Sequence, residues 1–175
     1  MNNVARSITA TRIIGIDPGS RFTGYGIIQV QGNQYKHITS GVIRTGKGEH
    51  AERLQIIYQE LNTLLIEHVP MVAAVEQVFM QRNVKTALIL GQARGAALVA
   101  LGQHKLNVAE YTARQIKQAV VGYGNAEKLQ IQHMVKLLLN LPQAPAEDAA
   151  DALAVAICHA LSSRVVLDSV QCHPR

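Results

Sequence analysis

The chain of 175 residues is 48% hydrophobic and 17% charged, a composition that excludes an intrinsically disordered protein and fits one globular domain. Lysine and arginine total 17 against 12 acidic residues, which favours a polyanionic partner such as nucleic acid. No apolar run approaches the ~20 residues of a membrane span, so we expect no membrane partner. The 2 cysteines lack metal-binding spacing, which suits a cytoplasmic protein without a zinc site.

The predicted elements follow an order that is typical of an α/β fold. Strand-like runs at 12–17, 23–30 and 34–44 are separated by short turns, and helical spacing of leucine and isoleucine follows over 49–69. Hairpin-like strands that precede βα units predict a mixed five-stranded sheet flanked by helices. The remaining elements are strands at 71–79 and 105–111 and helices at 83–103, 112–121, 126–140 and 147–162.

No internal repeat, low-complexity stretch or linker divides the chain. We therefore expect one domain over residues 12–162. Residues 1–11 lack the apolar centre of a signal peptide and are expected to form a flexible extension. Residues 163–175 are expected to form a C-terminal tail.

Two acidic residues interrupt apolar strands. Asp17 ends the strand that contains Ile14 and Ile16, and Glu76 follows the run "VAAV". Burial of an ionised carboxylate is unfavourable unless another group compensates it. Each residue alone has a simple structural explanation, because Asp17 can cap a turn and Glu76 can pair with a buried arginine.

Two further acids, Asp148 and Asp151, are three residues apart on the last predicted helix and therefore share a face. Asp148 alone is explained as a helix N-terminal residue, where the helix dipole favours negative charge. Four acids in one pocket, however, repel one another unless they are protonated or neutralised. Carboxylate oxygens suit hard divalent cations, and two such ions about 4 Å apart can assist displacement at a phosphodiester. This pattern favours a metal-dependent nuclease.

Five stretches extend this hypothesis: "GIDPGSRFTGYGII", "EQVFM", "LGQARG", "ARQIKQAVVGYGNAEKLQIQHMV" and "AEDAADALAVAICHA". With them, residues 12–161 closely resemble the bacterial Holliday-junction resolvases of the RuvC type, crossover-junction endodeoxyribonucleases with a ribonuclease H-like fold. The resemblance implies that a homodimer resolves four-way DNA junctions by paired, symmetric nicks, in homologous recombination and DNA repair. It also implies two Mg²⁺ ions per site, with Mn²⁺ as a substitute, and branch-migration proteins as partners. The implied metal ligands and catalytic residues are Asp17, Glu76, Asp148 and Asp151.

The same resemblance assigns DNA contacts. It places Lys117 and Lys128 near the scissile phosphate, Phe79 inside the junction and Arg114 at the DNA backbone. From the residue types alone, the two lysines are solvated surface charges and Phe79 is a core residue. The resemblance further implies that the Gly- and Ala-rich helix over 83–103 takes part in the dimer contact.

Two other classes of function compete with a nuclease. A nucleotide-binding domain of the actin and sugar-kinase type also opens on a strand, an aspartate and a glycine-rich turn, but it needs a second lobe and a second phosphate turn. "GIDPGSRFTG" is not the G-x-G-x-x-G pattern of dinucleotide-binding domains either. A non-catalytic DNA-binding module would not need four acids beside phosphates.

Overall fold

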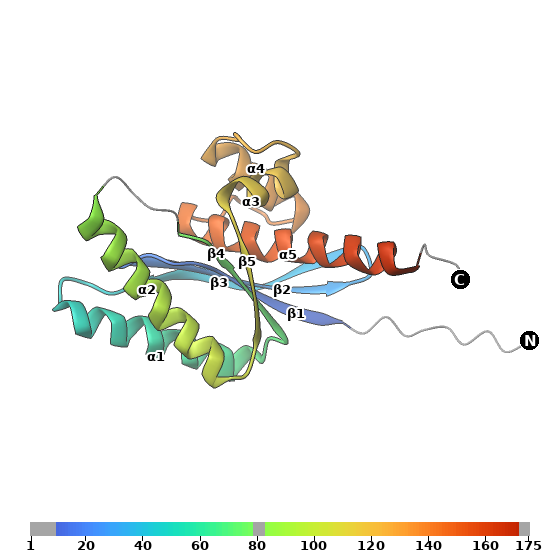
Figure 1. Cartoon of the computed structure of the whole chain (residues 1–175). Helices are drawn as coiled ribbons and strands as arrows, with labels where there is room; N and C mark the ends of the chain where they lie inside the picture. The colour runs from blue at the N-terminus through green and yellow to red at the C-terminus, as the bar shows by residue number, and fades with distance from the viewer. Residues whose placement is uncertain (1–9, 79–82, 172–175) are drawn as a thin grey trace, which may run out of the picture.

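The computed structural model describes residues 10–78 and 83–171, with side chains as far as residue 163. Its centre is a five-stranded sheet in the order β3-β2-β1-β4-β5, with helices on both faces (Figure 1). β1 pairs with β2 and β2 with β3 in antiparallel fashion, whereas β4 runs parallel to β1 and β5 parallel to β4. The expected mixed sheet is therefore confirmed. Its strands are β1 (Thr11–Asp17), β2 (Phe22–Gln31), β3 (Gln34–Arg44), β4 (Val72–Glu76) and β5 (Asn107–Tyr111).

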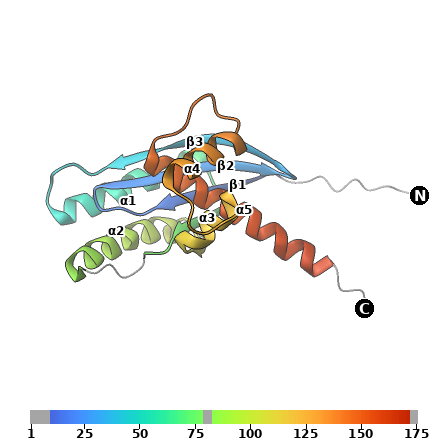
Figure 2. The ribbon, with the colours of Figure 1, turned by 90° about the horizontal axis from the view of Figure 1, so that it is seen from above.

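The helices form two layers, one on each face of the sheet. In Figures 1 and 2, α1 and α2 lie against one face, α5 crosses the other face, and α3 and α4 pack outside α5. Their bounds are α1 (His50–His68), α2 (Val84–Gln103), α3 (Ala113–Val121), α4 (Lys128–Leu138) and α5 (Glu147–Gln171).

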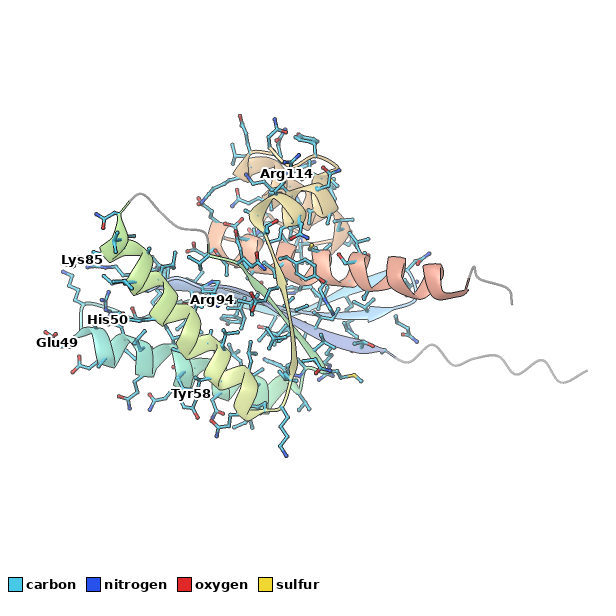
Figure 3. The ribbon with its side chains drawn as sticks, in the orientation of Figure 1. Glu49, His50, Tyr58, Lys85, Arg94 and Arg114 are labelled. Atoms are coloured by element: carbon cyan, nitrogen blue, oxygen red, sulfur yellow. The ribbon has the colours of Figure 1, made fainter. Side chains whose placement is uncertain are left out.

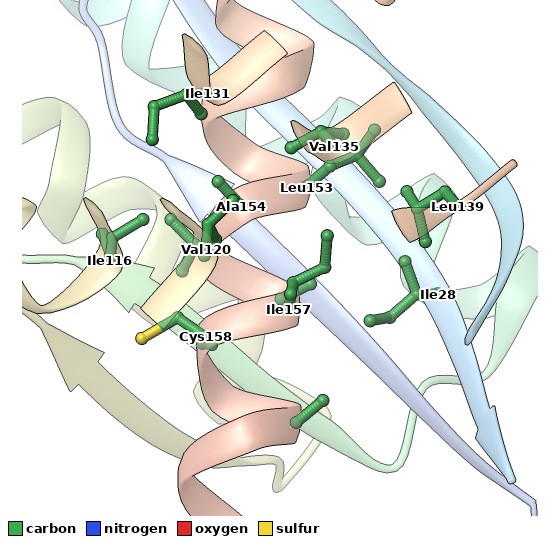
Figure 4. Close-up of a cluster of buried hydrophobic side chains, with 14 of the residues drawn as sticks. Ile28, Ile116, Val120, Ile131, Val135, Leu139, Leu153, Ala154, Ile157 and Cys158 are labelled. Carbon is green, nitrogen blue, oxygen red and sulfur yellow. The ribbon is translucent and has the colours of Figure 1, made fainter. Parts of the chain in front are cut away.

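Alternation along β1 divides the core between these layers. Ile14 and Ile16 belong to the cluster that α1 and α2 cover, and Ile13 belongs to the cluster around α5. Figure 4 shows this second cluster, in which Leu153 and Ile157 of α5 lie near Ile28 of β2. The strand period of two therefore assigns odd-numbered residues of β1 to the α5 face.

Glycines let α5 approach the sheet closely. A Cβ atom added to Gly15 would lie 2.1 Å from the carbonyl oxygen of Ala152, and one added to Gly24 would lie 2.1 Å from that of Asp148. No side chain fits at such distances, so only glycine permits this contact. The approach holds the first two turns of α5 directly against the end of β1 that carries Asp17.

Several element boundaries differ from the sequence-based expectation, most of them by one or two residues. β4 ends at Glu76 rather than at 79, and α4 is shorter than 126–140. α5 continues to Gln171, nine residues past the expected end at 162, because no proline or glycine interrupts "LSSRVVLDSV". The segment after 163 is thus helical over most of its described length.

Among the described residues, α2 is long and apolar enough to cross a membrane, judged by length and composition alone. The sequence-based expectation that no apolar run reaches this length was therefore wrong for α2. Its packing identifies it as a helix of the folded domain instead. Ala93, Ala97 and Leu101 are buried in the core. Arg94 points toward β5 (Figure 3), and its Nη2 atom lies 2.6 Å from Oε2 of Glu110.

Candidate active site

Asp17 and Glu76 lie side by side at the carboxyl ends of two adjacent parallel strands. The register pairs Ile16 of β1 with Val75 of β4, so the residues that follow them are neighbours. Both acids point to the α5 face, because they alternate with residues of the opposite core. Asp17 and Glu76 also share a side-chain hydrogen bond, which Glu76 accepts.

The turn that follows Asp17 is fixed by two buried threonines. The Oγ1 atom of Thr23 donates to the carbonyl oxygen of Gly19 at 2.6 Å, and that of Thr45 donates to the carbonyl oxygen of Ser20 at 2.9 Å. The backbone N–H of Thr45 donates to the carbonyl oxygen of Arg21 at 3.2 Å. These bonds join the β1–β2 turn to the end of β3 and hold Asp17 in place.

α5 brings the third and fourth acids to the same place. Asp151 faces a cavity of about 300 Å³ that Asp17 and Glu76 also line. Asp148, one turn earlier, does not line this cavity, although its charge raises the pKa of Asp17 and of Asp151. The other lining residues are Ala113, Ile116, Lys117, Lys128 and Ile131.

The cavity makes these carboxyl groups hard to ionise. Burial raises the pKa of Asp17 to about 8, and repulsion from Glu76, Asp151 and Asp148 adds to the effect. Burial likewise raises the pKa of Glu76 and of Asp151, although Lys117 and Lys128 act in the opposite direction. Without a further cation the site therefore retains protons at neutral pH.

This donor set fits a hard divalent cation. Carboxylate oxygens are the ligands such ions prefer, and positive charge at the centre would remove the repulsion that raises the pKa values. Across the described residues, no three His, Cys, Asp or Glu side chains are already arranged as a metal-binding cluster.

Two lysines reach the cavity from the outer helix layer. Lys117 lies in α3, and Lys128 is the first residue of α4. Lys128 also forms an ion pair with Glu147, whose side chain precedes the acids of α5. Glu147 was not among the residues predicted from the sequence, where its place next to Asp148 was its sole signal.

The remaining predicted DNA contacts lie elsewhere or outside the description. Arg114 of α3 (Figure 3) packs on Gly124, where an added Cβ would lie 2.6 Å from its Cγ atom. It lines a different cavity, of about 480 Å³, together with Tyr111 and Cys158. Phe79 falls outside the described residues.

The family is decided by the match of residues 13–159 to the model of the crossover junction endodeoxyribonuclease RuvC. The chain belongs to the RuvC family. RuvC of Coxiella burnetii is 61% identical over 153 residues, which cover 87% of this chain and 89% of that protein. RuvC of Pseudoalteromonas atlantica is 57% identical over 147 residues, with coverage of 84% and 85%.

A solved RuvC structure agrees with the fold of this RuvC-family chain. The structure of T. thermophilus RuvC in complex with a Holliday junction substrate superposes with a TM-score of 0.84 at 33% identity, and it covers 89% of this chain and 96% of that chain. The expected ribonuclease H-like fold and the resemblance to RuvC-type endodeoxyribonucleases are therefore confirmed.

Proposed function

We propose that this RuvC-family chain resolves four-way DNA junctions by metal-dependent hydrolysis of phosphodiester bonds. The observation that carries the proposal is the cavity where Asp17, Glu76 and Asp151, all with raised pKa, lie beside Lys117 and Lys128. Acids that resist ionisation suit a cation site, and the lysines suit a phosphate. A DNA-binding module without chemistry would have no use for such crowded carboxylates.

In this proposal Asp17, Glu76, Asp148 and Asp151 hold two Mg²⁺ ions, which Mn²⁺ can replace. The bound ions would supply Lewis acidity and a nucleophilic water at neutral pH. Asp17 is next to Glu76 in the sheet and close enough to the acids of α5 to feel their charge, so it would contribute a carboxylate to the ion site. This assignment is supported by the influence of all three other acids on its pKa.

The cationic residues hold the DNA. Lys117 and Lys128 would bind phosphate oxygens next to the scissile bond, because both line the carboxylate cavity. Arg114 would contact the backbone farther out, where it also packs on Gly124 in the loop that joins α3 to α4. Phe79 would enter the junction and stack on a base.

The outer face of α2 supports a homodimer. Its residues recur every three or four positions along the helix and so form one stripe, opposite the buried alanines. An added Cβ at Gly91 or Gly95 would meet no atom within 4 Å. Close helix packing across a two-fold axis would bury this stripe and direct one site to each of two opposed strands. The stripe consists of Val84, Leu88, Gly91, Gly95 and Val99.

The cellular setting follows from the same proposal. Junction cleavage belongs to homologous recombination and DNA repair, so we place the protein in the cytoplasm with branch-migration proteins of that pathway as partners. The excess of basic residues, 17 against 12 acidic ones, favours a DNA partner.

One assay tests the function. A synthetic four-way junction and a linear duplex of matched sequence are incubated with Mg²⁺, Mn²⁺, Ca²⁺ or a chelator. We expect paired nicks in the junction alone, with Mg²⁺ or Mn²⁺, and binding without cutting with Ca²⁺, whose larger, irregular coordination disorganises a two-ion site. Cutting in chelator would overturn the metal mechanism, and equal cutting of the duplex would overturn junction selectivity. Hydrolysis of ATP without DNA would favour the nucleotide-binding alternative.

A further inference from the structure

An exposed aromatic residue lies next to the candidate active site and has no role in the core. Phe22, the first residue of β2, is 49% exposed. The guanidinium carbon of Arg44 lies 5.2 Å from the centre of its ring. Aromatic residues make up only 4% of this chain, and Phe22 is one of 2 phenylalanines. About half of Phe22 is therefore presented to solvent, with a cation held against its ring.

The strand register places this pair on the same face of the sheet as the carboxylates. Asp17 pairs with Gly24, and Phe22, two residues earlier in β2, pairs with Arg44 at the end of β3. A Cβ on Gly24 would point at the Asp148 carbonyl oxygen of α5, so Gly24 marks the α5 face. Because side chains alternate, Phe22 and Arg44 share this face and lie about 7 Å farther along the strand than Gly24.

The backbone beneath the pair is held rigidly. The same threonine bonds that fix the β1–β2 turn span Gly19 to Thr23 on one side and Ser20 to Thr45 on the other. Phe22 and Arg44 lie between these bonds. Their positions relative to Asp17 are therefore fixed before any ligand arrives, as positioning of a substrate requires.

We infer that Phe22 and Arg44 form a nucleotide platform that positions the cleaved strand beside its scissile phosphate. Phe22 stacks on a base, and Arg44 binds the phosphate of the same or the next nucleotide while it stays over the ring. The inference rests on the proposed junction cleavage, since it concerns the same bound strand. The platform lies on the β3 side of the carboxylates, and Lys117 and Lys128 lie on the opposite, helical side.

The test uses junctions that carry a single abasic nucleotide at successive positions on either side of the cut. Binding is measured with Ca²⁺ and single-turnover cutting with Mg²⁺. We expect the parent to lose about tenfold in affinity at one abasic position, since a stacked base contributes on that scale. Phe22→Ala should bind the intact junction about tenfold more weakly than the parent does. The abasic nucleotide at the sensitive position should then cause no further loss of affinity in this variant. Phe22→Tyr should retain parental behaviour.

Arg44→Gln should weaken binding on every sequence and lower the slope of log affinity against log salt by about one, the signature of one lost phosphate contact. Two matched controls lie at the opposite end of the sheet. Lys36→Gln removes a charge from the same strand, and Ile66→Ala removes an exposed apolar side chain, 64% exposed, near the end of α1. Both should bind and cut as the parent does.

The outcomes separate this inference from the function on which it rests. A parent that cuts no junction overturns the proposed function. A parent that cuts, with Phe22→Ala and Arg44→Gln indistinguishable from the controls, overturns the platform. The platform is also overturned if an abasic nucleotide lowers the affinity of Phe22→Ala as much as it lowers the affinity of the parent. If Phe22→Ala lowers the melting temperature, Phe22→Leu replaces it, because leucine keeps apolar volume but offers no ring to a base.

Discussion

Asp17 and Glu76, at the ends of adjacent parallel strands, share a hydrogen bond that requires a proton on one of the two carboxyl groups. Burial and repulsion from three neighbouring acids raise the pKa of Asp17 to about 8, which favours retention of this proton at neutral pH. The fold thus holds acids together although they repel one another in the absence of metal. A divalent cation that replaces the proton would convert this repulsion into binding energy.

The first prediction concerns pH and stability in a chelating buffer. The pKa of Asp17 is about 8 in the folded protein against 3.8 for an ordinary aspartate, so between these limits the folded state binds more protons than the unfolded state. The free energy of unfolding should therefore fall as the pH rises from about 4 to about 8. Urea unfolding at a series of pH values measures this slope.

Asp17→Asn provides the matched comparison, because it keeps the shape of the side chain but cannot ionise. It should flatten the slope and make the protein more stable than the parent above pH ~8, by an amount on the order of 1–3 kcal/mol after solvent relaxation around the buried group. Parallel curves for the two proteins would show that Asp17 ionises freely in the folded state.

The second prediction separates chemistry from recognition. Asp17→Asn should reduce junction cutting by ~100-fold or more, since a neutral amide oxygen binds a divalent cation more weakly than an anionic carboxylate does. Junction binding should survive, because cationic side chains rather than this acid hold the phosphates. Gel shifts and cleavage of one junction measure both effects.

Glu76→Gln, Asp148→Asn and Asp151→Asn should repeat the pattern of Asp17→Asn. Glu60→Gln, on the exposed face of α1, removes an equal charge far from the cavity and should change nothing. Loss of binding and cutting together in Asp17→Asn would contradict its assignment to the metal ions.

The third prediction concerns Lys128 and its partner Glu147. Their side chains are 64% and 53% exposed, so the ion pair contributes about 0–1 kcal/mol to stability and a phosphate can displace it. Glu147→Gln should bind junctions as well as the parent or more tightly at low salt, since Lys128 loses a competing anion. Lys128→Ala and Lys117→Ala should weaken binding and each reduce the salt slope by about one.

The double variant Lys128→Ala, Glu147→Gln decides whether the two residues act on each other. In the Lys128→Ala background, Glu147→Gln should not increase the affinity for the junction. Equal gains in both backgrounds would mean that Glu147 repels DNA directly and does not act through Lys128.

The sheet was predicted correctly from the sequence, and the four acids were singled out for a common reason: both inferences depend on local patterns. Isoleucines on both faces of β1 predicted a buried strand, and a charged residue such as Asp17 at the end of a buried strand needed an explanation other than packing. The close approach of α5 to Gly15 and Gly24 was not predictable, because a glycine in a strand does not reveal which segment lies above it. That approach decides where Asp148 and Asp151 lie.

The features that sequence reasoning missed depend on tertiary register. Phe22 and Arg44 are 22 positions apart in the chain, and only the β2–β3 pairing places one over the other. Glu147 meets Lys128 because the fold places the first residues of α4 and α5 next to each other. Arg94 of α2 pairs with Glu110 of β5, so it is not the buried arginine that was considered as a partner for Glu76.

The last prediction tests the dimer through the stripe on α2. Gly95 faces away from the core, and a Cβ atom added there would meet no atom of another element within 4 Å. Gly95→Glu should therefore leave the monomer folded, with a gain of roughly 0.5–1 kcal/mol in helix stability from the loss of glycine. In a closely packed two-fold interface, however, the same glutamate would bury an unpaired charge beside its symmetry mate. The dimer should then dissociate at least about tenfold more readily.

Sedimentation equilibrium measures the association, and a supercoiled plasmid with an extruded cruciform reports the consequence for cutting. The parent should linearise the plasmid by two coupled nicks, whereas Gly95→Glu should give mainly nicked circles, since the two sites no longer act on one junction. Ile66→Glu places the same charge on an exposed apolar position of α1 and should behave as the parent does. A Gly95→Glu protein that stays dimeric and still linearises the plasmid would place the two-fold interface on another surface.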